Sequence, residues 1–461
     1  MKHAFLRRLK DILGAGGVLD DPGDCWAYGY DNSRRHALPE LVGFAVESAQ
    51  VREVVRRCNE YRVPLVARGR GTGTTGATVP VGGGVVLSLE RMDRVLEVNP
   101  DDRLMVVEPG VTNQAVQDRA AELGFFWPPD PTSAGYCTVG GNLGHNSAGP
   151  RAVKYGTPRE NTLGLRAVTG AGEELRTGVR TTKGVVGYDL TRLLIGSEGT
   201  LAVITEATLK LTPLPESRRA MRAVYRDIAS AAAAIARIMA QPVIPCALEY
   251  IGGLGMDLVR GSPGVELPEG AGALLLIEVD GPAACVDRAA EAIAAAARGP
   301  GLLDLAVGTG TDDAGHLWAA RKALSPALRR LAPKKINEDV AVPVSQLPAF
   351  IEGAERLAGR YRVPIVNFGH AGNGNIHTNL MVDPGEAGQL ERAEQCLSDI
   401  FDLVLSLGGT LSGEHGVGLE KRPFVGREID SVTLGVMRRI KRDFDPNEIL
   451  NPGKLFPDDV A

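Results

Sequence analysis

The chain has few cysteines and histidines, no excess of positive charge and no long hydrophobic run. Its six cysteines are scattered without a CxxC pair. They therefore indicate neither a disulfide framework nor an iron–sulfur cluster, and we expect a reducing compartment. The formal net charge of −5 excludes nucleic acid as a partner. No stretch reaches the roughly 18–20 apolar residues of a membrane span, so we expect a cytoplasmic protein. A peripheral position at the inner membrane face is the alternative.

The length and texture of the chain predict at least two domains. At 461 residues it exceeds the roughly 250–300 at which one hydrophobic core stops growing. Helical spacing over residues 48–61 is followed by a strand at VPLVA and the glycine loop RGRGTGTTG. After the proline-marked LTPLPES, alanine-rich helical stretches at 227–240 and 283–298 flank the strand-like ALLLIEVD. A domain boundary near Glu216 and a second α+β domain are therefore expected. The sequence YRVPIV in this second part resembles YRVPLV in the first. We interpret both as the end of a helix followed by a strand, and not as an internal repeat.

The glycine loop favours phosphate binding without a Rossmann fold. Gly71, Gly73 and Gly76 satisfy GxGxxG, but that fingerprint requires a helix directly afterwards. Pro80 and a triple glycine follow instead, so NAD is not predicted. Consecutive backbone N–H groups can still form an anion-binding nest for a pyrophosphate. A second polar, glycine-rich segment, residues 127–156, either binds a flat heterocycle and its phosphates or is a plain Ω-loop.

Three of the seven histidines fall in two short motifs, HAGNGNIH (His370 and His377) and SGEHGVG (Glu414 and His415). VPIVNF and IHTNLMV flank an Asn-Gly dipeptide at 373–374, which predicts a two-residue hairpin turn. That turn would place the first two histidines directly opposite each other, with Cβ atoms about 5 Å apart. Two imidazoles and a carboxylate suit zinc, ferrous iron or manganese. The alternative is an ordinary hairpin with both histidines solvated.

Eight motifs between about residues 31 and 457 carry a family resemblance. They are VPLVARGRGTGTTGA, PPDPTS, TVGGNLGHNSAG, GSEGTLAVITEATLKL, WAARKAL, FGHAGNGNIHTNL, SGEHGVGLEK and LNPGKLFP. In this order the chain resembles flavoproteins of the vanillyl-alcohol oxidase type. The similar branch is that of FAD-linked D-2-hydroxyacid dehydrogenases, which holds D-lactate dehydrogenases, the glycolate oxidase D subunit and D-2-hydroxyglutarate dehydrogenases. The resemblance implies an α+β fold with a vanillyl-alcohol oxidase (PCMH) type FAD-binding domain at 1–215. An α+β cap with the substrate and metal sites would span 216–440, and a C-terminal segment, 441–461, would return to the FAD domain.

The resemblance also implies where FAD binds. The implied cofactor-binding residues are Arg68, Gly69, Arg70, Gly71, Thr72, Gly73, Thr74, Gly76, Pro129, Asp130, Thr132, Thr138, Gly141, Asn142, Ser147, Gly149, Glu198, Gly199, Ile204 and Asn451. Some relatives attach FAD through a histidine, but the glycine loop contains none, so we expect non-covalent FAD. The two arginines of the loop either assist or are solvated. His145 departs from the family pattern, and either faces the flavin or caps its loop.

The family's metal ligands fall on His370, His377 and Glu414, its catalytic base on His415 and a substrate contact on Asn375. These residues and FAD imply metal-assisted oxidation of a small D-2-hydroxy acid to the 2-oxo acid. His415 would take the hydroxyl proton while hydride passes to FAD N5.

The substrate is expected to be a small monocarboxylate. Arg321 and Ser325 match an Arg and hydroxyl pair at the substrate mouth of the hydroxyglutarate members, although Arg321 could instead be a surface charge. A substrate-contacting lysine of those members falls on Asn337 here. We therefore rank D-lactate above glycolate and D-2-hydroxyglutarate.

The reduced flavin needs a partner acceptor, since the chain has no cluster of its own. Electron-transfer flavoprotein, an iron–sulfur subunit and a quinone are the candidates, and a homodimer is compatible with the sequence. A more distant alternative is a flavin transferase of the alkyl-glycerone-phosphate synthase kind, whose run of adjacent histidines is absent. A non-catalytic FAD-binding subunit should lack the metal motif.

Overall fold

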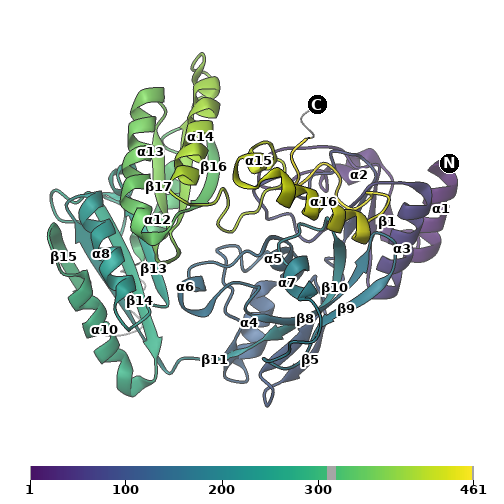
Figure 1. Cartoon of the computed structure of the whole chain (residues 1–461), viewed down its shortest axis with the longest axis horizontal. Coiled ribbons are helices and arrows are strands. Elements are labelled where there is room, and N and C mark those ends of the chain that lie inside the picture. Colours follow the sequence, from purple (N-terminus) through teal and green to yellow (C-terminus); the bar gives the residue numbers. More distant parts are fainter. Residues whose placement is uncertain (1, 309–317, 459–461) are drawn as a thin grey trace. The chain divides into compact units, whose positions relative to one another are not determined.

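The computed structural model describes residues 2–308 and 318–458 and divides the chain into two compact units (Figure 1). Unit 1 comprises Met1–Gly149, Gly156–Leu214 and Glu414–Ala461, and unit 2 comprises Pro150–Tyr155 and Pro215–Gly413. The first long crossing lies within LTPLPES. The return begins at residue 414, earlier than the 441 expected from the sequence, because the chain bonds to unit 1 from that residue on: the N–H of Gly149 donates to Glu414 Oε2 (2.8 Å).

Unit 1 is built on a four-stranded sheet, order β1-β2-β4-β3, and a five-stranded sheet, order β5-β6-β10-β8-β9, with a β11-β7 pair. The strands are β1 (Val18–Leu19), β2 (Leu41–Phe44), β3 (Leu65–Arg68), β4 (Val85–Ser88), β5 (Val95–Asn99), β6 (Leu104–Val107), β7 (Phe125–Phe126), β8 (Thr162–Thr169), β9 (Glu174–Gly178), β10 (Ala202–Lys210) and β11 (Thr212–Pro213). The helices are α1 (Lys2–Leu13), α2 (Pro22–Trp26), α3 (Ser48–Tyr61), α4 (Asn113–Ala121), α5 (Val139–His145), α7 (Leu190–Leu194), α15 (Val425–Glu428) and α16 (Ser431–Phe444), with 3-10 turns η1 (Ala15–Gly17) and η4 (Arg422–Phe424).

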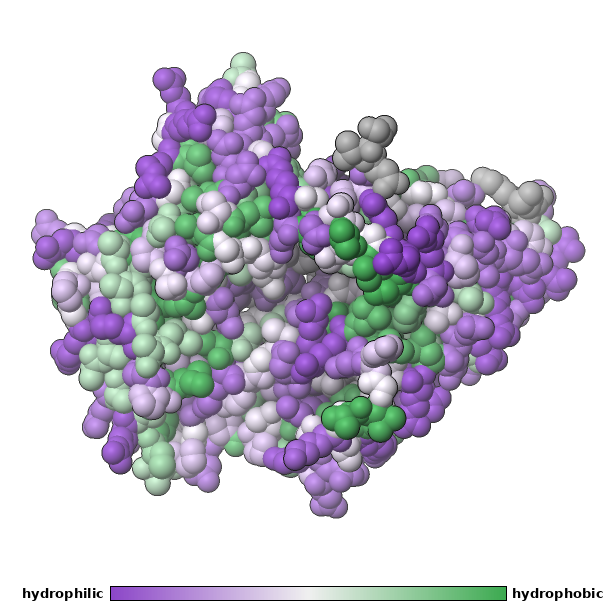
Figure 2. Space-filling view, in the orientation of Figure 1, coloured by the Kyte–Doolittle hydropathy of each residue, from purple (hydrophilic) through white to green (hydrophobic). Residues whose placement is uncertain are grey.

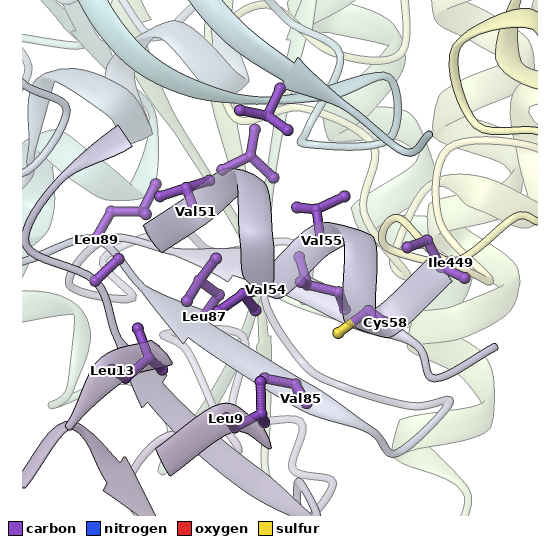
Figure 3. Packing of buried hydrophobic residues seen from close by; sticks show 14 of the residues in the cluster. Leu9, Leu13, Val51, Val54, Val55, Cys58, Val85, Leu87, Leu89 and Ile449 are labelled. Atoms are coloured by element: carbon purple, nitrogen blue, oxygen red, sulfur yellow. The ribbon is translucent and has the colours of Figure 1, made fainter. Parts of the chain in front are cut away.

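The core beneath the four-stranded sheet shows why α3 forms. Its buried apolar residues, Val51, Val54, Val55 and Cys58, recur every three to four positions on one face, which confirms the helix predicted over 48–61. Figure 3 shows α3 packed with residues of α1, β4 and the C-terminal segment. The residues labelled there are Leu9, Leu13, Val51, Val54, Val55, Cys58, Val85, Leu87, Leu89 and Ile449. The last of these anchors the end of the chain in the core of unit 1.

Unit 2 is a seven-stranded sheet, order β15-β12-β14-β13-β17-β18-β16. Its strands are β12 (Ser217–Tyr225), β13 (Ala247–Gly252), β14 (Ala273–Gly281), β15 (Leu302–Val307), β16 (Lys334–Ala341), β17 (Ile365–His370) and β18 (Asn375–Val382). Its helices are α6 (Ala152–Tyr155), α8 (Ile228–Ala240), α9 (Leu254–Val259), α10 (Ala283–Ala297), α12 (Ala319–Leu328), α13 (Leu347–Tyr361) and α14 (Gln389–Ser406), with 3-10 turns η2 (Val344–Gln346) and η3 (Ala371–Asn373). Figure 2 shows hydrophilic residues along the outer sides of α13 and α14 and hydrophobic residues between these two amphipathic helices.

The repeated YRVP sequence is a helix exit used twice. Helices α3 and α13 both end at an arginine in the left-handed conformation, Arg62 (φ 51°) and Arg362 (φ 54°). In each case the next valine donates its N–H to a carbonyl of the last helical turn, and proline then prevents the helix from continuing. The chain leaves directly into β3 and β17, which carry the glycine loop and the first histidine.

Within the described ranges, no helix combines the length and hydropathy that crossing a membrane would require.

Candidate active site

A cleft in unit 1 lies along the first two residues of the glycine loop, helix α5 and the turn before β10, and the predicted loop residues from Arg70 to Gly76 do not line it. Several predicted cofactor residues line it: Arg68, Gly69, Thr138, Gly141, Glu198, Gly199 and Ile204. His145, whose role the sequence left open, also lines the cleft, and sequence reasoning missed the remaining lining residues, Ala67, Ala77, Thr78, Leu89, Pro109, Gly140, Gly144, Ser197, Ala202 and Val203. Most of these are small or apolar side chains, and such residues carry no chemical signal in a sequence.

The cleft and the glycine loop that continues from its edge together fit a phosphate-bearing cofactor. A Cβ at Gly69 would lie 2.3 Å from Thr138 Oγ1, and one at Gly140 would lie 2.7 Å from Pro109 Cβ, so the backbone must stay bare there. Among the described residues, none accepts a hydrogen bond from the N–H groups of residues 70–75. The buried Thr74 Oγ1 likewise has no partner in that part of the chain. A row of unused donors in a glycine turn matches the anion-binding nest expected from the sequence.

The two loop arginines differ. Arg68 is buried and donates to the carbonyl of Tyr30 (2.7 Å) and to Thr78 Oγ1 (3.2 Å), so it braces the loop. Its guanidinium occupies the space that a Cβ at Gly71 would need. Arg70 is exposed. The rest of the loop, Thr72 to Gly76, forms no helix or strand.

The segment from 129 to 149 is folded, not a loose loop. The buried Asn142 accepts a hydrogen bond from Asn113 Nδ2 (3.1 Å), and its backbone carbonyl accepts one from the N–H of Ser147 (3.0 Å). Asn113, which the sequence did not single out, also donates to the carbonyl of Pro129 (3.0 Å). Gly149 has φ 90°, and a Cβ there would lie 2.6 Å from the carbonyl of Asp130. Thr132 is exposed, and none of the predicted residues of this segment other than Thr138 and Gly141 lines the cleft described above.

Asn451 ties the C-terminal segment to the cleft. Its amide donates to the carbonyls of Ala77 (2.9 Å) and Glu198 (2.7 Å). Lys454 adds bonds to the carbonyl of Val79 (2.6 Å) and to Asn451 Oδ1 (3.3 Å). The predicted cofactor residue Asn451 therefore positions the residues of the cleft.

The Glu414–His415 segment is held by unit 1. Glu414 Oε2 accepts hydrogen bonds from the N–H groups of Ala148 (3.3 Å) and Gly149 (2.8 Å). The backbone carbonyl of His415 accepts one from His145 Nδ1 (3.0 Å). His145, whose role the sequence left open, thus fixes the backbone of His415 and also lines the cleft.

Glu198 holds the next residues. Its buried carboxylate accepts hydrogen bonds from the N–H groups of Val417 (2.5 Å) and Gly418 (2.8 Å). Glu198 itself has φ 52°, a conformation that is uncommon outside glycine. The same residue therefore lines the cleft and anchors the loop that carries His415.

The histidine pair of unit 2 lies in a register different from the predicted one. The observed partners across β17 and β18 are His370 with Asn375 and Phe368 with His377. The expectation that His370 directly opposes His377 across a two-residue turn is wrong. The two histidines are diagonal neighbours on one face of the sheet, both buried, with ring centroids 5.2 Å apart and planes at 83°.

A four-residue loop explains the register. Residues 371–373 form a 3-10 turn that ends at Gly374, which has φ 70° and donates to the carbonyl of Ala371 (3.0 Å). The carbonyl of Gly374 accepts from Val342 (3.1 Å), and a Cβ at Gly374 would lie 1.9 Å from the oxygen of Val342. The end of β16 therefore fixes how the hairpin closes, a constraint that lies about 30 residues away in the sequence.

Glu249 in β13 stands behind the first histidine. It is 1% exposed, and His370 donates from Nδ1 to its Oε1 (2.5 Å) while Arg321 Nε lies 3.3 Å from its Oε2. Burial raises the pKa of Glu249, but the charges of His370, Arg321 and His377 and the hydrogen bond from His370 outweigh it and lower the pKa to about 2. An ionised carboxylate on Nδ1 fixes the orientation and the tautomer of the imidazole ring. In the sequence, the feature that could have revealed Glu249 is its position as the single charged residue in the apolar strand ALEYIG.

The chain that leads to Glu414 runs along the same strands. Thr410 pairs with Ala341, and Ser412 Oγ donates to Asp339 Oδ1 (3.3 Å). Asp339 is in turn the cross-strand partner of His377. A Cβ at Gly413 would lie 2.1 Å from Asn375 Nδ2. Gly413, the last residue of unit 2, therefore lies against the start of β18.

Two family domains match the chain. The C-terminal domain of FAD linked oxidases matches residues 214–455, and an FAD binding domain matches residues 39–178. The chain is 38% identical over 454 residues to the glycolate oxidase subunit GlcD of Bacillus subtilis (strain 168), covering 98% of this chain and 97% of that protein. The chain belongs to the FAD-linked oxidase family.

Two further comparisons fit this FAD-linked oxidoreductase. It is 32% identical to the mitochondrial D-lactate dehydrogenase [cytochrome] of Arabidopsis thaliana, covering 99% of this chain and 81% of that one. The structure of p-cresol methylhydroxylase with substrate bound superposes with a TM-score of 0.78 at 18% identity, over 98% of this chain and 96% of that one. The predicted α+β fold of the vanillyl-alcohol oxidase (PCMH) type, the predicted family and FAD as cofactor are confirmed.

The predicted substrate residues of this flavoprotein lie in unit 2. Asn375 is buried and donates from Nδ2 to the carbonyl of Val340 (2.9 Å). Arg321 is not a free surface charge, because it pairs with Glu249 and its guanidinium lies 4.8 Å from the ring centroid of Phe368. The side chain of Ser325, also on α12, lies outside the part of the chain that the structure describes.

Proposed function

We propose that this flavoprotein oxidises a small D-2-hydroxy acid to its 2-oxo acid, with D-lactate favoured over glycolate and D-2-hydroxyglutarate. Relatives named as a glycolate oxidase subunit and a D-lactate dehydrogenase support this class of substrate. The observation that carries the proposal is the buried pair His370 and His377, with Glu249 bonded to Nδ1 of the first. A carboxylate behind an imidazole is the usual support of a metal-ligating histidine.

His370, His377 and Glu414 form the proposed ligand set for a divalent metal. Two imidazoles and one carboxylate leave coordination positions open for substrate, and zinc, ferrous iron and manganese all accept such donors. The donor chemistry supports the group in two ways. The ring of His370 is locked by Glu249, and the carboxylate of Glu414 is oriented by the two N–H groups of Ala148 and Gly149.

When bound, FAD would accept the α-hydrogen as hydride, and a divalent cation would polarise the hydroxyl and carboxylate oxygens of the substrate. The chain itself must then remove the hydroxyl proton. His415 is the proposed base, because it follows the ligand Glu414 and its backbone is fixed by His145. Asn375, one residue beyond the hairpin loop, is the proposed substrate contact, and Arg321 would neutralise charge near Glu249 and the substrate.

Electrons must leave the reduced flavin through a partner. The six cysteines are free, and five of them are buried and dispersed over both units, which supports transfer to an external acceptor. Electron-transfer flavoprotein, an iron–sulfur subunit or a quinone would serve.

The experiment is anaerobic bleaching of the flavin absorbance by D-lactate, L-lactate, glycolate and D-2-hydroxyglutarate, with and without prior chelation. We expect D-lactate, glycolate or D-2-hydroxyglutarate to bleach the flavin. Chelation should abolish this bleaching, and added metal should restore it. Bleaching that survives complete metal removal would overturn the metal-assisted step. No bleaching by any of the acids, with flavin bound, would overturn the substrate class.

A further inference from the structure

Unit 2 has a pocket of its own, which lies on the face of its sheet opposite the face that carries the histidines. Its volume is about 360 Å³, within the range of roughly 300–1,000 Å³ typical of small-molecule sites. Tyr250 of β13 and Asn367 of β17 line it. Successive residues of a strand point to opposite faces, so Tyr250 points away from the face of its neighbour Glu249, and Asn367 points away from that of His370. The sheet therefore separates this pocket from the proposed metal site.

Two of the polar side chains that line the pocket, Tyr250 and Asn367, are buried and each has an oxygen without a hydrogen-bond partner within the described residues. Tyr250 is 0% exposed and Asn367 is 6% exposed. Within the described residues, neither the Tyr250 hydroxyl nor Asn367 Oδ1 makes a hydrogen bond. Leaving such groups unsatisfied costs about 1–3 kcal/mol each. An occupant that supplied hydrogen bonds would recover this free energy.

Two glycines make room for polar groups at one end of the pocket. A Cβ at Gly252 would lie 1.8 Å from the Tyr250 hydroxyl, and one at Gly253 would lie 3.2 Å from Glu355 Oε1. The Tyr250 hydroxyl therefore lies beside Gly252, and the Glu355 carboxylate lies beside the next residue, Gly253. Glu355 comes from α13 and lies at the exposed mouth of the pocket.

The charge at this end is negative. Burial raises the pKa of Tyr250, and the charge of Glu355 raises it further. Arg362, the cation among the described lining residues, is exposed. The remaining wall is mostly aliphatic and is made by Ile228, Leu254, Ile351, Ala358, Val363 and Ile365.

We propose that this pocket is a binding site for a small primary amine with an apolar body. The ammonium group would donate to the Tyr250 hydroxyl oxygen, to Asn367 Oδ1 and to the Glu355 carboxylate. Three acceptors match the three N–H donors of an ammonium group. An alcohol offers a single donor, and a carboxylate would meet the negative charge of Glu355. The apolar body would lie along the aliphatic wall.

The test is isothermal titration of the full-length, FAD-loaded protein with benzylamine, benzyl alcohol and benzoate, which share one body and differ in head group. Benzylamine should bind, benzyl alcohol at least tenfold more weakly, and benzoate not at all. Benzylamine binding should persist in His370→Ala, because the pocket is on the other face of the sheet. Equal or tighter binding of the alcohol or the acid, or loss of amine binding in His370→Ala, would overturn the proposal.

Variants separate the pocket from adventitious binding. Tyr250→Phe and Asn367→Leu should each weaken benzylamine at least tenfold, and Ala358→Leu, which fills the aliphatic wall, should abolish binding. Tyr250→Phe should raise the melting temperature of the free protein, because it removes a buried hydroxyl that has no partner within the described residues. Tyr225→Phe is the matched control: Tyr225 is equally buried, but its hydroxyl donates to the carbonyl of Ala297 (2.7 Å). It should lower the melting temperature and leave benzylamine binding unchanged. Unchanged binding in Tyr250→Phe and Ala358→Leu, or no binding of any probe to the parent protein, would mean that the pocket holds water only.

Discussion

His370 and His377 lie diagonally across the β17–β18 pair, with their ring centroids 5.2 Å apart. The residue directly opposite His377 is Phe368. The guanidinium of Arg321 lies over the ring of Phe368. The diagonal arrangement keeps both imidazoles on one face, because side chains of a strand alternate with period two. It also brings Glu249, from a third strand, behind His370.

Replacing either histidine by alanine should remove the metal and the activity. We expect substrate-driven flavin reduction to fall by more than the roughly 10–100-fold typical of outer-shell changes, while FAD stays bound, because the cleft belongs to unit 1. Elemental analysis and anaerobic flavin reduction measure the two effects. His36→Ala is the control, since His36 is exposed in unit 1 and contacts Trp26. Full metal content in His370→Ala would rule out the ligand assignment.

Glu249→Gln should weaken metal binding without removing it. The amide can still accept from His370 but cannot supply the charge, so metal affinity should drop by roughly 10–100-fold. Competition against a chromophoric chelator measures this. Glu278→Gln is a suitable control, because Glu278 lies on the neighbouring β14 opposite Ala247 and does not pair with His370. Equal affinities in the parent and Glu249→Gln would show that the carboxylate does not support the metal.

Glu198→Gln should loosen the loop that carries His415. Two charge-assisted hydrogen bonds, to the N–H groups of Val417 and Gly418, become ordinary ones, and we expect a loss of about 1–3 kcal/mol in the free energy of unfolding. Urea unfolding and the rate of FAD loss report on it. Glu206→Gln, on the partly exposed side of β10, should change neither. An unaltered unfolding curve for Glu198→Gln would contradict the anchoring role.

Lys454 should make stability rise with pH in the alkaline range. Burial lowers the pKa of Lys454 to about 8, against the opposing charges of Glu198 and Asp31. An unfolded lysine has a pKa near 10.4, so between these values the unfolded chain binds more protons and unfolding becomes less favourable as pH increases. Below pH 8 both states are protonated, and the full cost of burying the charge remains.

The measurement is urea unfolding at several pH values from 7.5 to 10.5, taken as the difference between the parent and Lys454→Met. The stability of the parent relative to the variant should increase by about 1–3 kcal/mol across this range. Lys183→Met, at an exposed position, should show no such trend. A difference that is flat with pH would mean that the ammonium is not disfavoured by folding.

Gly374→Ala should strain the histidine hairpin. Its φ of 70° and the 1.9 Å approach of a Cβ to the Val342 carbonyl predict a loss of about 1–3 kcal/mol or more, together with lower metal affinity. Gly359→Ala is the control, since Gly359 is exposed on α13 with nothing within 4 Å of a Cβ, and it should instead stabilise the protein slightly. A neutral Gly374→Ala would show that the loop can close another way.

Local patterns were enough to predict several elements. The spacing of Val51, Val54, Val55 and Cys58 predicted α3, and the proline after each YRV marked where two helices end. The absence of a helix after the glycine loop excluded the Rossmann fold. These inferences succeed because periodicity, proline and glycine act on the backbone within a few residues.

The hairpin register could not be predicted in this way. The Asn-Gly dipeptide indicated a two-residue turn, yet the bond between Val342 and Gly374 selects a four-residue loop. Glu249 and His145 were not assigned their contacts, because their partners His370 and His415 lie 121 and 270 residues away. The unpartnered Tyr250 hydroxyl likewise has meaning only once burial is known.

By itself, the sequence determined the family, the FAD-binding class of fold, and the residue types that can hold a metal and move a proton, because each is carried by a short motif with a fixed chemical meaning. Only the tertiary structure decided which residues meet. Strand pairing set the diagonal histidines, β13 supplied Glu249, and the return of the chain at residue 414 brought His415 under His145 and Glu198. The physical reason is that hydrogen bonds and burial act through space, and partners in space can be any distance apart in the sequence.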